Sequence, residues 1–109
     1  MKLSRRLFLS QSLSDLGDAS RMLLRSGHIP HRAAYFLSLS SDGRFLYIYE
    51  RSAYTEKWFR KSGETVVGLA LSKAEAEELC GEIVALSVKE TGSPEPGPYL
   101  RRFLEENDA

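Results

Sequence analysis

The sequence of 109 residues contains a single cysteine and no long run of apolar residues. One cysteine cannot form an internal disulfide, which is typical of proteins that work in a reducing compartment. No stretch approaches the roughly 20 apolar residues that a helix needs to cross a bilayer. Residues 4–9 resemble a twin-arginine export signal, but Asp15 and Asp18 interrupt the apolar run that such a signal requires. We therefore expect a protein of the cytoplasm, or of the nucleus in a eukaryote, with no membrane partner.

The motifs of enzymes and of metal sites are also missing. No glycine-rich loop of the phosphate-binding type occurs, and no group of cysteines or carboxylates accompanies His28 and His31 to complete a metal site. The acidic residues between 75 and 82 are predicted to face solvent on a helix, whereas catalytic carboxylates need an enclosing pocket. Cys80 is expected to pack in the core, where burial raises the pKa of its thiol and makes it a poor nucleophile. We expect no enzymatic activity, no metal and no cofactor.

Positive and negative charges are equal in number but separated along the chain. Residues 1–31 and residues 32–61 each carry a net charge of +3, whereas residues 72–109 carry −5. A net charge of zero argues against a generic nucleic-acid-binding protein. A basic sheet beside an acidic helical part can nevertheless present one face to phosphate groups.

An Asp-Gly pair predicts a β-hairpin in the middle of the chain. Segments 33–40 and 44–51 flank Asp42-Gly43, which is a strong signal for a tight turn. A two-residue turn there pairs Leu39 with Leu46 and Leu37 with Ile48, so these four residues share one face of the sheet. The opposite face then carries Phe36, Ser38, Phe45, Tyr47 and Tyr49.

A second hairpin is predicted at Ser62-Gly63, between segments 58–61 and 64–71. In this register Trp58 opposes Val67 on the aliphatic face, and Phe59 opposes Val66 on the aromatic face. A helix follows, with Ser72 as its N-cap and Glu75 completing a capping box. The apolar stripe of this helix is expected to cover the aliphatic face of the sheet; it comprises Ala76, Leu79, Cys80, Ile83, Leu86 and Ser87.

These elements predict an α+β fold in which a four-stranded antiparallel sheet, built from two hairpins, is followed by one long amphipathic helix. Residues 32–90 form this core domain. Residues 1–31 form an N-terminal extension, in which 2–11 is a short strand or an arm and 12–27 a helix. Residues 91–109 combine a Pro- and Gly-rich linker with a short C-terminal helix, whose apolar side carries Leu100, Phe103 and Leu104.

Parts of residues 33–90 resemble a group of single-stranded-DNA-binding transcription regulators. The segments 35–39 and 43–48, YFLSL and GRFLYI, are similar to the first hairpin of a PUR repeat. The segment 68–72, GLALS, resembles the last strand and helix start of PUR repeats and of the positive-cofactor-four coactivators. The order of two hairpins and one helix is shared with these proteins and with Whirly proteins. Asp42 departs from the pattern, because PUR repeats usually have basic or amide residues in this turn.

The resemblance implies a homodimer formed through helix 72–90 and the sheet edges, with single-stranded DNA or RNA bound on the open sheet face. Aromatic rings beside cations suit this role, because each stacked base contributes about 1–3 kcal/mol whatever the sequence. Such a protein would be a transcription or replication accessory factor. The expected binding residues are Arg44, Phe45, Tyr47, Tyr49, Arg51, Lys57, Phe59 and Lys61.

Two other interpretations stay open, and a third, less favoured one is an enzyme with an unrecognised pocket. In the first, the aromatic residues form a second core beneath the N-terminal extension or a partner subunit. In the second, the chain is a protein-interaction module, an inhibitor or assembly factor that does not bind nucleic acid. Its partner would contact the acidic helix or the apolar side of the C-terminal helix.

Overall fold

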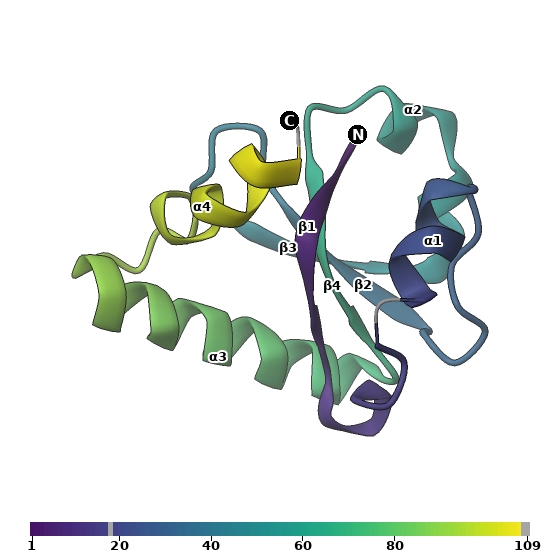
Figure 1. Cartoon of the computed structure of the whole chain (residues 1–109), viewed down its shortest axis with the longest axis horizontal. Helices are drawn as coiled ribbons and strands as arrows, with labels where there is room; N and C mark the ends of the chain where they lie inside the picture. Colours follow the sequence, from purple (N-terminus) through teal and green to yellow (C-terminus); the bar gives the residue numbers. More distant parts are fainter. Residues whose placement is uncertain (18, 108–109) are drawn as a thin grey trace.

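Four strands form one mixed sheet, in the order β1-β4-β2-β3 (Figure 1). The computed structural model describes residues 1–17 and 19–107, with side chains as far as residue 102. β1 (Lys2–Leu9) runs parallel to β4 (Thr65–Ala70). β4 is antiparallel to β2 (Tyr35–Leu39), which is antiparallel to β3 (Leu46–Glu50). β4 and β2 are therefore central, and β1 and β3 are the two edge strands.

Helices cover both faces of this sheet (Figure 1). α3 (Lys73–Thr91) and α4 (Gly97–Asn107) lie on one face and enclose a largely aliphatic core. The other face is covered by α1 (Ala19–Arg25), α2 (Lys57–Arg60) and two 3-10 turns, η1 (Gln11–Leu13) and η2 (Arg51–Thr55). The core on this second face is rich in aromatic residues and comprises Leu13, Leu24, Ala33, Phe36, Tyr54, Phe59, Val66 and Leu69.

The prediction of a purely antiparallel sheet made from two hairpins is wrong, because the segment 58–61 is helical. The amides of Arg60 and Lys61 donate to the carbonyl oxygens of Glu56 and Lys57 over 3.0 and 3.1 Å, which closes α2. This helical turn buries Phe59 completely. The place beside β4 is taken by β1, whose eight residues provide a longer strand than four residues before a turn.

The register of the first hairpin is confirmed, with Leu39 opposite Leu46 and Leu37 opposite Ile48. The turn itself is wider than the predicted two-residue turn. Only Gly43 has a positive φ in this loop, of 78°, whereas a type I′ turn requires positive φ at both central residues. The Asp42 carboxylate instead accepts hydrogen bonds from the Ser40 hydroxyl and the Arg44 amide, at 2.7 and 3.1 Å.

The long helix, α3, covers the aliphatic face of the sheet, as its apolar stripe predicts. Ala76, Leu79, Ile83 and Ser87 are buried against the aliphatic face, and Cys80 is half-buried. The Ser72 hydroxyl accepts a hydrogen bond from the Glu75 amide and so caps the helix. The Glu75 carboxylate does not complete the capping box through Ser72. It accepts hydrogen bonds from the amide and hydroxyl of Ser12, at 3.1 and 2.7 Å, which lower its pKa and connect η1 to α3.

The predicted helix over 12–27 is divided into η1 and α1. Gly17 has φ of 58°, outside the right-handed helical region, so no continuous helix can run from η1 to α1. Asp18 lies outside the described residues. At the other end, Gly92 closes α3 in the left-handed conformation, and α4 begins at Gly97. Leu100 is buried, and the side chains of Phe103 and Leu104 lie outside the described part. The Gly97 amide donates to the Gly43 carbonyl oxygen over 2.8 Å.

Two glycine-to-alanine substitutions test the packing of the sheet. A Cβ on Gly68 would lie 2.8 Å from the Phe8 carbonyl oxygen and 3.3 Å from a Leu79 methyl carbon. Gly68→Ala should therefore lower the free energy of unfolding by about 1–3 kcal/mol, because β1 or α3 must move. Gly81→Ala is the control, since nothing lies within 4 Å of its Cβ on the exposed side of α3. It should raise the free energy of unfolding by about 1 kcal/mol.

Chemical denaturation of both variants measures these changes. Equal effects of the two substitutions would contradict the close contact between β1 and β4 at Gly68.

Candidate nucleic-acid interface

A row of four aromatic rings follows β3 and continues onto α2. We call it the aromatic strip; it consists of Phe45, Tyr47, Tyr49 and Trp58. The first three share a face because side chains alternate along a strand. The ring centroids are 6.5 Å apart for Phe45 and Tyr47, 6.1 Å for Tyr47 and Tyr49, and 5.7 Å for Tyr49 and Trp58. The four rings therefore form one continuous row.

Most of the aromatic strip is exposed to solvent. Phe45 is 51% exposed, Tyr47 40% and Trp58 54%, while Tyr49 is half-buried. The planes of Phe45 and Tyr47 lie only 22° from parallel. Exposed rings at such spacing offer surfaces on which flat, apolar groups can stack.

The aromatic face of the sheet is thus divided into a covered part and an open part. Phe36 and Phe59 are fully buried, with ring centroids 5.1 Å apart. Phe59 has no exposed surface, so the interface does not include it. Trp58 was predicted on the aliphatic face, but α2 turns it toward Tyr49. A helical pattern across 57–60 would have placed Trp58 correctly, yet four residues are too few to distinguish a helix from a strand.

Tyr49 is fixed in position by the half-buried carboxylate of Glu64. Its hydroxyl donates to Glu64, at 3.0 and 3.1 Å from the two carboxylate oxygens, and the Ser38 hydroxyl donates to Glu64 over 2.9 Å. Burial, followed by the hydrogen bond and negative charge of Glu64, raises the pKa of Tyr49 to about 12. This arrangement holds the centre of the aromatic strip against the sheet.

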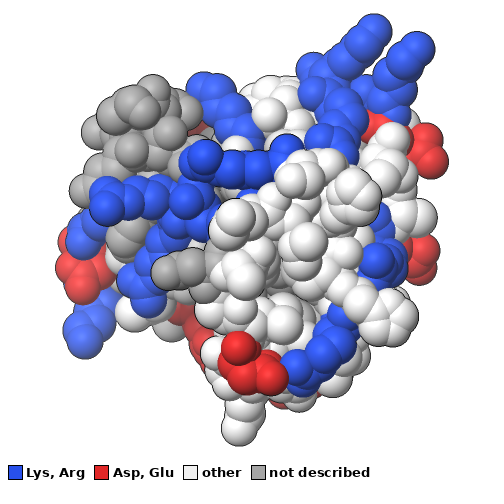
Figure 2. Space-filling view, turned by 45° about the vertical axis from the view of Figure 1, so that its right-hand side comes forward, with Lys and Arg blue, Asp and Glu red and all other residues white. Residues whose placement is uncertain are grey.

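Exposed cations lie at both ends of the aromatic strip. The guanidinium of Arg44 lies 5.6 Å from the centre of the Phe45 ring, and its Nε is 3.4 Å from a carboxylate oxygen of Glu95. Lys57 and Lys61 belong to α2 and its C-cap, beside Trp58, and both are exposed. Figure 2, which brings the side of α1 and α2 forward, shows Lys and Arg side chains around a largely uncharged surface.

Two other basic residues near the strip have structural contacts. The guanidinium of Arg51 donates to carbonyl oxygens of the segment 29–33, including that of His31 over 2.7 Å, and so holds this connector to the end of β3. Arg60 lies over the Tyr54 ring, 4.5 Å from its centroid, and reaches the Gly27 carbonyl oxygen. Of the predicted cations, Arg44, Lys57 and Lys61 are exposed beside the aromatic strip, and a ligand at Arg44 would share its guanidinium with Glu95.

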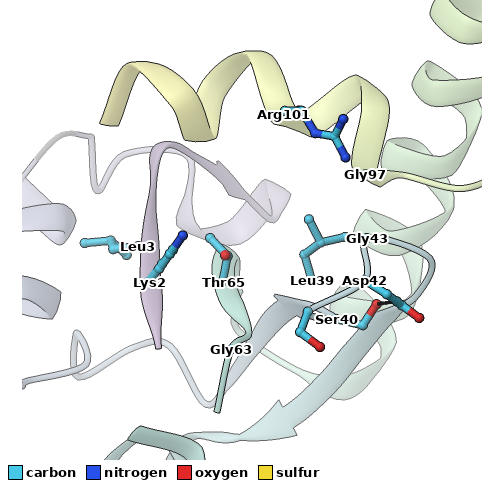
Figure 3. A pocket seen from close by; sticks show the side chains of 11 residues that line it. Lys2, Leu3, Leu39, Ser40, Asp42, Gly43, Gly63, Thr65, Gly97 and Arg101 are labelled. Atoms are coloured by element: carbon cyan, nitrogen blue, oxygen red, sulfur yellow. Dashed lines mark hydrogen bonds between the residues drawn. The ribbon is translucent and has the colours of Figure 1, made fainter. Parts of the chain in front are cut away.

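A polar cavity of about 170 Å³ lies at another part of the molecule, between the 40–43 turn, the start of β1 and the start of α4 (Figure 3). Its lining combines the cations Lys2 and Arg101 with the carboxylate of Asp42. The hydrogen bonds from Ser40 and Arg44 lower the pKa of that carboxyl group. No group of three or more metal-binding side chains occurs among the residues that the structure describes.

Comparisons with family models, curated proteins and solved structures found no match for this chain. The resemblance to PUR repeats depends on two consecutive hairpins. Among the described residues the hairpin of β2 and β3 is present, whereas the predicted second hairpin is replaced by α2 and β4. Within the described residues, no helix has the length and apolar character needed to cross a membrane.

The raised pKa of Tyr49 predicts a loss of stability at high pH. The phenol of an unfolded tyrosine loses its proton near pH 10, whereas the folded protein keeps the Tyr49 proton to about pH 12. The free energy of unfolding should therefore fall as the pH rises from 10 to 12. In Tyr49→Phe this fall should be shallower, and the ultraviolet absorbance titration should lose a late-titrating tyrosine. An unchanged alkaline end of the titration curve would contradict the hydrogen bond between Tyr49 and Glu64.

Proposed function

We propose that the protein binds single-stranded DNA or RNA on the aromatic strip and carries out no catalysis. The observation that supports this most directly is the continuous row of four rings, three of them at least 40% exposed. Base stacking on such rings contributes about 1–3 kcal/mol per base and tolerates any sequence. Arg44 at one end and Lys57 and Lys61 at the other would contact the phosphates.

The charge distribution supports binding in which stacking contributes more than phosphate contacts. The whole chain has no net charge, and only three of the predicted cations are exposed beside the rings. We place this activity in the cytoplasm, or in the nucleus of a eukaryote, as that of a transcription or replication accessory factor. The single, half-buried cysteine supports a reducing compartment.

A second candidate is the protein-interaction module, which a separate surface favours. α1 exposes Met22 and Leu23 to 73% and 45%, and Arg21 and Arg25 lie on the same helix. An apolar centre with cations around it suits an acidic partner protein. A gel shift with a short single-stranded oligonucleotide separates the two candidates, because only the first predicts a shifted band.

Substitutions in the aromatic strip test the stacking. Tyr47→Ala and Trp58→Ala should each weaken binding of a labelled single-stranded oligonucleotide by about tenfold, because each removes a stacking surface. The matched control is Met22→Ala, which removes an exposed apolar side chain from α1. Fluorescence anisotropy measures the affinity, and circular dichroism confirms that each variant is folded. Unchanged affinity in both strip variants would refute the proposed interface.

The dependence of binding on salt tests the phosphate contacts. With three phosphate contacts, a plot of log affinity against log salt concentration should have a slope of roughly −2, since each contact on a single strand contributes about −0.7. Lys57→Gln should reduce the steepness by about one contact, while Lys89→Gln on α3 should not change it. A flat plot for the unmodified protein would show that no phosphate is neutralised.

A further inference from the structure

The two edge strands of the sheet differ in how well they are protected. Native proteins usually block a free strand edge, because its unpaired amide and carbonyl groups can pair with another chain. Along β1 the register with β4 is interrupted between Leu3 and Phe8, and the Arg21 Nε donates to the Ser4 carbonyl oxygen over 3.1 Å. β3 pairs regularly with β2 over all five of its residues and contains no bulge or proline. Its sequence, LYIYE, is rich in residues that favour strands.

The hydrogen bonds to β2 show which groups of β3 face outward. The Ser40 amide donates to the Phe45 carbonyl oxygen, and the Arg51 amide donates to the Ala34 carbonyl oxygen. In an antiparallel ladder the bonded pairs alternate, so the backbone groups of residues 45, 47, 49 and 51 point toward β2. The amide and carbonyl groups of Leu46 and Ile48 therefore point away from the sheet.

We propose that β3 pairs antiparallel with the β3 of a second copy of this chain, about a two-fold axis that passes beside Tyr47. The axis stands perpendicular to the sheet, so residues that face each other must lie on the same face, which restricts the possible registers. With Tyr47 opposite the partner's Tyr47, Leu46 exchanges backbone hydrogen bonds with the partner's Ile48. Symmetry repeats this exchange, so the outward groups of both residues are satisfied in both copies.

The side chains of β3 and its flanking residues are complementary to themselves in this register. Phe45 lies opposite the partner's Tyr49 on the aromatic face. On the other face Leu46 lies opposite the partner's Ile48, and the cation of Arg44 lies opposite the carboxylate of the partner's Glu50. The next permitted register in one direction would place Leu46 opposite the partner's Glu50, and the next in the other direction would place Arg44 opposite the partner's Ile48. Charge complementarity therefore selects the register centred on Tyr47 and identifies the second copy as the occupant of this edge.

Pairing of this kind would join two four-stranded sheets into one of eight strands and bring their aromatic strips side by side. The rings project from the face of the sheet and not from its edge, so they stay accessible in the dimer. The dimer goes beyond the proposed function and does not depend on it.

Charge reversal at the two ends of β3 tests the dimer in the absence of nucleic acid. Arg44 and Glu50 are both exposed, but Arg44→Glu also removes the contact between the Arg44 guanidinium and Glu95 of the same chain, so circular dichroism first verifies that each variant is folded. Arg44→Glu alone and Glu50→Arg alone each place like charges opposite each other, and each should raise the dissociation constant of the dimer by about tenfold or more. An equimolar mixture of the two variants restores opposite charges at both positions and should form a heterodimer. Sedimentation velocity over a range of concentrations measures all three samples.

Controls separate this interface from one formed by the long helix. Gly81→Arg introduces a large side chain on the exposed face of α3 and should leave the dimer intact. Hydrogen exchange should show protection of the Leu46 and Ile48 amides that increases with protein concentration, while the Tyr47 and Tyr49 amides do not change. A protein that stays monomeric at all concentrations would overturn the proposal. A dimer that survives both charge reversals, or that is lost with Gly81→Arg, would do so too.

Discussion

The fold depends on the burial of β4 on both of its faces. All six residues from Thr65 to Ala70 are buried, and the strand has a parallel neighbour on one side and an antiparallel neighbour on the other. A strand of this kind needs apolar cover above and below. α3 and α4 provide it on one side, and α1, η1, η2 and α2 provide it on the other. The helices thus concentrate over the centre of the sheet, and β3, which is separated from β4 by β2, lies at the limit of this cover.

The division of the aromatic residues follows from that position. Phe36 lies on β2, one strand from β4, and is completely buried. Tyr49 lies on β3 close to α2 and is half-buried, whereas Tyr47 near the start of β3 and Phe45 directly before it are exposed. One face of one sheet therefore contributes both to the core and to the surface. The hydrogen bond between Tyr49 and Glu64 marks the boundary between the two parts.

The parts of the fold that the sequence predicts correctly are those with local signals. The Asp42-Gly43 turn determines the pairing of Leu39 with Leu46, and the three- and four-residue spacing of Ala76, Leu79 and Ile83 determines the buried side of α3. The parallel pairing of β1 with β4 has no local signal, since more than 50 residues separate the strands. For the interface, the rings of Phe45, Tyr47 and Tyr49 could be assigned to one face from alternation alone. The burial of Phe59 and the exposure of Trp58 could not be predicted from alternation, because both follow from the single helical turn of α2.

The hydrogen bond between Gly97 and Gly43 has a mechanical consequence. A Cβ on Gly97 would lie 2.6 Å from the Gly43 carbonyl oxygen, so the backbones of α4 and of the β2–β3 turn touch without intervening side chains. The residues after this turn are Arg44 and Phe45. A displacement of the start of α4 at Gly97 must therefore either break this hydrogen bond or move the hairpin tip, and with the tip the neighbouring Phe45 ring.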